Sequence, residues 1–154
     1  MLSPEEKKEI DKEIAHVPDR KSASIEALKT VQRHRGWISD ESIKEISDYL
    51  GMSPDELDSV ATFYNLIFRQ PVGDHVIMIC DSVSCWIDGY QGILQMLNEQ
   101  LGITLGETTE DGKFTLLPIP CLGTCDRAPA MMIDTDLHRD LTPEKIGEIL
   151  EQYK

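Results

Sequence analysis

The chain has 154 residues, of which 40% are hydrophobic, enough for the core of one domain or of two small domains that share an interface and too many for a globally disordered protein. Its 28 acidic and 15 basic residues give a net charge of −13, which disfavours nucleic acid or an anionic lipid surface as the partner. No apolar run approaches the roughly 20 residues of a membrane helix, and the N-terminal MLSPEEKKEI has no apolar signal core. We therefore expect a cytosolic chain with reduced thiols and no direct membrane insertion.

The first part of the chain, residues 1–70, contains four stretches whose apolar residues recur every three or four positions, which is typical of helices. Ser3 and Ser53 each precede Pro and, three residues later, Glu, so both predict a capping box at a helix start. The first helix is expected to stop at Pro18, and the second and third to end near Gly36 and Gly51. Each helix has a single apolar stripe, so we expect a small helical bundle whose exit is the segment 60–68, ambiguous between helix and strand.

The second part, residues 71–154, begins where Pro71-Val72-Gly73 separates the helical pattern from strand and turn signals. The expected elements are a doubly buried strand over 75–80, a helix over 90–101, a tight turn at Asp111-Gly112, strands over 114–119 and 130–133, and a last helix after Thr142. The order β-α-β-β-α predicts a thioredoxin-like arrangement with a central sheet covered by helices. The whole chain is thus of the α+β or α/β class, with a helical bundle before a thioredoxin-like domain.

The chain has four cysteines, all in its second part and arranged as two close pairs. Cys80 ends a predicted strand and Cys85 lies in the following loop, while Cys121 follows the next strand and Cys125 lies in the loop after it. If these strands are neighbours, their ends bring both loops to one edge of the sheet. We therefore expect the four thiolates to converge there.

Four convergent thiolates suit either of two metal groups. A [2Fe–2S] cluster takes two thiolates on each iron and needs backbone N–H groups directed at its sulfurs, which Ser82, Ser84, Gly123 and Thr124 are placed to supply. A structural zinc ion also accepts four cysteines, and the spacing alone leaves a redox-inactive zinc module open. Disulfides are disfavoured in a reduced cytosol, and the C-x-x-C spacing of a thioredoxin redox pair is absent.

The two cysteine loops, CDSVSCWIDGY and CLGTCDRAP, resemble those of a known family: the small thioredoxin-like [2Fe–2S] subunits of the NADH dehydrogenase module of respiratory complex I. The resemblance extends along nearly the whole chain, through SIEALKTVQRHRGW, VATFY, RQPVG and LTPEKI. It implies a [2Fe–2S] cluster bound by Cys80, Cys85, Cys121 and Cys125, with the first pair on one iron and the second pair on the other.

The same resemblance implies a one-electron carrier that exchanges electrons with the flavin of a partner NADH dehydrogenase subunit, inside NADH:quinone oxidoreductase. FMN and NAD would be bound by the partner, since this chain has no dinucleotide-binding motif. The isolated chain would catalyse nothing, and within the complex it would lie peripherally on the cytoplasmic side of the inner membrane. The equivalent subunit of an NAD-linked hydrogenase or formate dehydrogenase remains an alternative host.

Two residues of the loops fit no single role. Pro120 precedes Cys121, restricts the backbone of Ile119 and removes one N–H donor. Trp86 follows Cys85 and is expected either to shield the cluster from water or to pack against the start of the helix.

Overall fold

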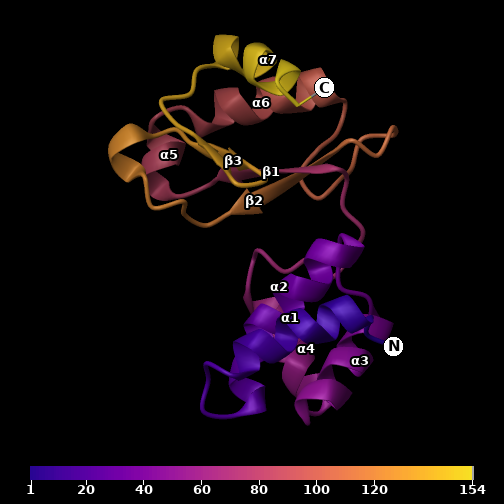
Figure 1. Ribbon diagram of the computed structural model, residues 1–154. Coiled ribbons are helices and arrows are strands. Elements are labelled where there is room, and N and C mark those ends of the chain that lie inside the picture. Colours follow the sequence, from indigo (N-terminus) through magenta and orange to yellow (C-terminus); the bar gives the residue numbers. More distant parts are fainter. Residues whose placement is uncertain (154) are drawn as a thin grey trace. The chain divides into compact units, whose positions relative to one another are not determined.

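The computed structural model describes residues 1–153 of the chain, which form two compact units. A helical unit comprises Met1–Pro71, and an α/β unit begins at Val72 (Figure 1). Residue 154, the last of the predicted second domain, lies outside the described residues.

The helical unit contains four α-helices and one short 3-10 helix: α1 (Pro4–Ile14), η1 (Arg20–Ala23), α2 (Ser24–Arg35), α3 (Asp40–Leu50) and α4 (Pro54–Phe63). Both predicted capping boxes are confirmed, because the side chains of Ser3 and Ser53 accept from the third helical N–H and the Glu at that position bonds back to the cap. The segment 60–68 is helical as far as Phe63 and then leaves the helix in an extended conformation at Tyr64. The first helix is shorter than expected and ends at Ile14, well before Pro18.

A continuous apolar core holds the four helices together. It includes Ile10 of α1, Leu28 and Val31 of α2, Ile46 of α3 and Leu57 of α4. Each of these residues lies on the apolar stripe of its helix, so the bundle follows from the helical spacing in the sequence.

The α/β unit contains β1 (His75–Cys80), α5 (Val83–Ile87), α6 (Tyr90–Leu101), β2 (Phe114–Ile119), η2 (Cys125–Arg127), β3 (Met131–Ile133), β4 (Asp136–His138) and α7 (Pro143–Glu151). The bounds of β1 and β2 are those predicted. Two short elements, α5 and β4, were not predicted: α5 occupies part of the expected loop around Cys85, and β4 adds an edge strand.

The sheet has the strand order β2-β1-β3-β4, with β1 parallel to β2 and antiparallel to β3. Strand β1 is therefore central, which explains its nearly continuous apolar sequence. Helices α6 and α7 contact each other and lie together on one face of the sheet (Figure 1). Ile77 and Ile79 of β1 share one core with Ile93 of α6 and Ile146 of α7.

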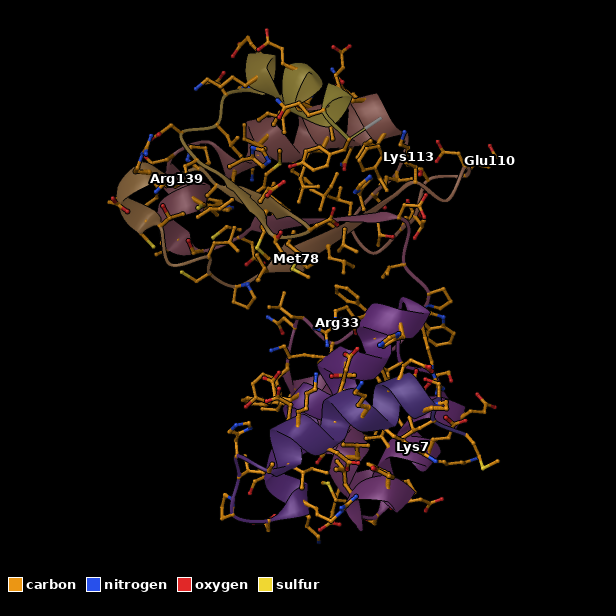
Figure 2. The ribbon with its side chains drawn as sticks, viewed as in Figure 1. Lys7, Arg33, Met78, Glu110, Lys113 and Arg139 are labelled. Atoms are coloured by element: carbon orange, nitrogen blue, oxygen red, sulfur yellow. The ribbon has the colours of Figure 1, made fainter. Side chains whose placement is uncertain are left out.

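The predicted tight turn before β2 is confirmed. The N–H of Thr109 donates to the carbonyl of Phe114 at 2.8 Å, and Gly112 has a φ of 73°, which favours glycine. Glu110 and Lys113 of this turn lie at the end of the sheet opposite to α5 (Figures 1 and 2). The end of the sheet that carries the cysteines is thus separate from the hairpin. No helix within residues 1–153 has the length and apolar character needed to cross a membrane.

Candidate functional site

The parallel pairing of β1 and β2 brings the two cysteine segments to one end of the sheet. Cys80, the last residue of β1, is in register with Ile119, the last residue of β2. The N–H of Asp81 donates to the carbonyl of Ile119 at 3.0 Å, and the N–H of Cys80 donates to the carbonyl of Ala130 at 3.1 Å. The backbone therefore brings the starts of the two cysteine segments to the same end of the sheet, as expected. The convergence of all four thiols stays a prediction, since no three of them are arranged within residues 1–153 to hold one metal ion.

The first pair, Cys80 and Cys85, is buried, with 2% and 1% of the residue exposed. Cys85 sits on α5, a five-residue helix whose N-cap is Ser82, so a helical turn rather than an irregular loop sets its direction. The Cys80 Sγ atom lies 3.4 Å from Ser82 Oγ. Cys80 thus lies at the end of β1 and Cys85 within α5, so regular secondary structure positions both thiols.

Burial and hydrogen bonding shift the pKa values of these two thiols in opposite directions. Burial raises the pKa of Cys80, but bonds from the hydroxyl and N–H of Ser82, from the N–H of Leu122 and from Cys85 outweigh it, so the pKa lies below its usual value. Burial and the neighbouring Cys80 raise the pKa of Cys85, and bonds from Ser82 and from the backbone of Ala130 offset this only in part.

The second pair, Cys121 and Cys125, is exposed, and its two Sγ atoms are 3.9 Å apart. Gly123 has a φ of 73°, and this conformation directs its N–H to Cys121 Sγ at 3.2 Å. Cys125 opens the 3-10 helix η2. The short loop between the two cysteines thus gathers both thiols on the protein surface.

Backbone N–H groups reach the thiols from both segments, as a negatively charged metal group requires. Of the expected donors, Ser82 and Gly123 point to Cys80 and Cys121. The N–H of Leu122, in the second cysteine segment, lowers the pKa of Cys80, and the N–H of Ala130, directly before β3, lowers that of Cys85. Sequence reasoning missed both donors because each is distant in the sequence from the thiol that it serves.

The residues present fit a [2Fe–2S] cluster. The thiols form two close pairs, and each iron of such a cluster takes two thiolates. The hydroxyl of Thr124, in the second cysteine loop, is buried and makes no hydrogen bond to any of residues 1–153. A group rich in sulfur acceptors matches such a donor.

The loop residues without an assigned role differ in exposure. Trp86 is 56% exposed, and with Val83 and Ile87 it forms an outward apolar face on α5. Pro120 is also exposed and lies immediately after β2. Neither residue is part of the core around the thiols.

Comparison with known proteins identifies the family of the chain. Residues 10–154 match the family model of the thioredoxin-like [2Fe–2S] ferredoxin. The E subunit of NADH-quinone oxidoreductase from Escherichia coli strain K12 is 56% identical, and the one from Pseudomonas aeruginosa is 50% identical, each over 99% of this chain and 92% of the relative.

A crystal structure of an NAD+-reducing [NiFe]-hydrogenase has the same fold, with a TM-score of 0.70 and 24% identity, over 82% of this chain and 22% of the hydrogenase chain. The family match and the E-subunit relatives support a [2Fe–2S] cofactor rather than zinc. The chain therefore belongs to the thioredoxin-like [2Fe–2S] ferredoxin family, among the E subunits of NADH-quinone oxidoreductase.

Proposed function

We propose that the chain is a one-electron carrier of NADH-quinone oxidoreductase, with Cys80, Cys85, Cys121 and Cys125 as the ligands of its [2Fe–2S] cluster. The observation that carries the proposal is the parallel register of β1 and β2, in which Cys80 and Ile119 end neighbouring strands and are followed in the sequence by Cys85 and by Cys121. When bound, the cluster supplies reversible one-electron chemistry. The near full-length similarity to E subunits favours this host over a hydrogenase, with which the chain shares the fold.

The protein contributes an asymmetric environment to this chemistry. Cys80 and Cys85 hold one half of the site inside the unit, where N–H groups of Ser82 and Leu122 stabilise negative charge on sulfur. Cys121 and Cys125 hold the other half at the surface. An electron partner therefore approaches closest on the side of the second pair.

The exposed residues that are close in the sequence to the cysteines suggest what kind of partner binds there. Val83, Trp86 and Ile87 expose an apolar face on α5, the helix that also carries Cys85. Asp81, Asp88 and Asp126, each within three residues of a cysteine in the sequence, are exposed and carry negative charge. A protein with an apolar patch and a basic rim would match this face.

We assign that role to a flavin-bearing NADH dehydrogenase subunit. Hydride arrives as an electron pair, so a flavin must separate it into single electrons, and the sequence has no dinucleotide-binding motif of its own. The complex would place the chain peripherally on the cytoplasmic side of the inner membrane.

The helical unit offers a second contact surface for the same partner. Phe63, Tyr64 and Leu66 are exposed where the chain leaves α4, and the rings of Phe63 and Tyr64 pack edge to face with centroids 5.2 Å apart. All four cysteines lie beyond this unit, so the helices are not needed to bind the cluster. We therefore propose that they dock the flavin-bearing subunit.

The metal content of the purified chain tests the proposed function directly. Anaerobically purified protein should be red-brown and contain about two iron and two sulfide per chain. Excess NADH should leave its visible spectrum unchanged, while dithionite should bleach it, and adding the flavin-bearing subunit should make NADH effective. A colourless zinc protein, or rapid bleaching by NADH without flavin, would overturn the proposal.

Point variants of the full chain test whether the apolar face of α5 contacts the flavin-bearing subunit. Trp86→Ala combined with Ile87→Ser should weaken co-purification with the flavin-bearing subunit while leaving the cluster spectrum intact. Leu137→Ser on β4 is the control, because Leu137 is a similarly exposed apolar residue on a different element.

A deletion tests the proposed docking role of the helical unit. Removing residues 1–65 should leave a coloured α/β unit that no longer co-purifies with the flavin-bearing subunit. Undiminished binding would exclude the helices as a docking surface.

A further inference from the structure

Thr124 carries a buried hydroxyl that the fold itself does not use. The residue is 7% exposed, and among residues 1–153 its Oγ1 is the only buried side-chain nitrogen or oxygen without a hydrogen-bond partner. Leaving such a group unpaired costs free energy, so proteins normally satisfy it. The exception marks a place where a partner from outside the chain is expected.

Other buried hydroxyls of the molecule show the normal behaviour. Thr115 of β2 accepts a bond from the N–H of Gly73 at 2.7 Å and lies 2.8 Å from the hydroxyl of Thr108. Ser47 donates to the carbonyl of Lys44 at 3.0 Å. The unpaired state of Thr124 is therefore specific to its position between Cys121 and Cys125.

The side chain of Thr124 does not cap the short helix that follows it, the usual local role of a threonine at this position. Thr124 is the N-cap of η2, yet its side chain makes no capping bond, and only its carbonyl is engaged, by the N–H of Arg127 at 3.0 Å. Its neighbour Gly123 already directs its N–H to Cys121 Sγ. Thr124 thus directly follows, in the sequence, a residue whose backbone N–H serves a thiol of the site.

We propose that the Thr124 hydroxyl donates a hydrogen bond to a sulfur atom at the second half of the cluster site and thereby raises the reduction potential. The inference rests on the proposed function, since it requires the cluster at these cysteines. Thiolate and sulfide sulfurs accept hydrogen bonds, and a donor stabilises the more negative, reduced state more than the oxidised state. Thr124 is in this sense a positioning and tuning residue rather than a ligand.

Thr124→Val tests the proposal, because valine keeps the branched shape and removes only the hydroxyl. In an EPR-monitored redox titration of the purified full chain, we expect the ratio of reduced to oxidised cluster at a fixed potential to fall roughly tenfold, the size of a typical hydrogen bond. For a one-electron couple, a tenfold change corresponds to about 59 mV toward more negative potential. Thr124→Ser, which keeps the hydroxyl, should stay close to the parent chain.

Two controls keep the test decisive. Thr115→Val removes another buried hydroxyl of the same unit at the opposite end of β2, and it should leave the midpoint unchanged even where it lowers stability. If Thr124→Val does not take up the cluster, Thr124→Ala carries the same expectation of a more negative midpoint.

The outcomes separate this inference from the proposed function. A coloured Thr124→Val or Thr124→Ala protein with the midpoint of the parent chain would refute the hydrogen bond and leave the carrier function standing. A parent chain without iron and sulfide would refute the carrier function itself. A resonance Raman spectrum gives an independent readout, since iron–sulfur bands that shift in D2O should shift less in Thr124→Val than in the parent.

Discussion

The two cysteine segments of the α/β unit are built in opposite ways. Residues 80–85 join the central strand to a short helix, and both of their thiols are buried. Residues 121–125 form a surface loop shaped by the positive φ of Gly123, and both of their thiols are exposed. The difference teaches that one half of the site is part of the folded framework, whereas the other half is presented to solvent or to a partner.

The largest expected effect is loss of the cluster when a thiol is removed from either cysteine segment. Each of the variants Cys80→Ala, Cys85→Ala, Cys121→Ala and Cys125→Ala should lose the cluster or hold it only transiently, because the sequence has no spare cysteine. Iron and sulfide analysis of the four purified variants measures this. A variant with full cluster content would remove its residue from the proposed ligand set.

Serine replacements should expose the difference between the pairs. An alkoxide is a poor substitute for a thiolate, and at Cys121 or Cys125 water can solvate an oxygen that is not bound to iron. At Cys80 or Cys85 the same oxygen would be buried, which is costly when it is unpaired. We expect measurable residual cluster in Cys121→Ser and Cys125→Ser and less in the two buried variants, and equal contents would contradict the comparison.

Alkylation of the cluster-free chain should distinguish the pairs kinetically. Iodoacetamide should modify Cys121 and Cys125 readily, whereas Cys80 and Cys85 become reactive only when β1 and α5 open. If that opening costs about 5 kcal/mol, near the lower end of global stability, protection amounts to roughly a thousandfold or more. Peptide mass spectrometry over time measures the four rates, with denatured protein as the control in which all four thiols react alike.

The midpoint potential tests whether both pairs act as thiolate ligands. All-cysteine ligation and the net charge of −13 favour a negative value, roughly −300 to −450 mV. Replacement of a thiolate by histidine would raise it, but neither cysteine loop contains a histidine. EPR-monitored titration gives the value, and a positive midpoint would be incompatible with four thiolates in an acidic protein.

The smallest expected effect is a shift in the pKa of Cys80, one of the two buried thiols. Ser82→Ala removes the hydroxyl that helps to hold the pKa of Cys80 low against burial, so this pKa should rise in the cluster-free chain. Thiolate absorbance near 240 nm, followed over pH, reports the shift. Ser84→Ala is the matched control, because Ser84 is in the same segment and does not contribute to the pKa of Cys80.

Much of this architecture could be predicted because its signals are strong and local. The apolar runs in the sequence indicate where β1 and β2 end, and the parallel pairing sets Cys80 beside Ile119, two residues before Cys121. Helix α5 has only five residues, too few for an apolar period to be seen, and its outward side chains are apolar as in a strand. Strand β4 has three residues and is stabilised by pairing with β3, which no local pattern reveals.

The parts of the site that sequence reasoning missed depend on contacts between distant segments. The N–H groups of Leu122 and Ala130 serve Cys80 and Cys85, which are distant in the sequence, so only the folded backbone shows them. Thr124 was expected to offer its backbone N–H, whereas the structure draws attention to its hydroxyl. That distinction requires knowledge of burial, which a single sequence does not give for a loop residue.

The parallel pairing of β1 with β2 also has an entropic consequence. A group bound by both cysteine segments would close a loop of about 35 residues, from Cys85 through α6 and the hairpin to Cys121, much as a disulfide would. In the chain-entropy picture, such a cross-link lowers the conformational entropy of the unfolded chain and so stabilises the folded unit by about 4 kcal/mol. The bound group would thus also raise the free energy of unfolding of the α/β unit. Its loss under oxidative damage would lower the stability of α6 and β2 together.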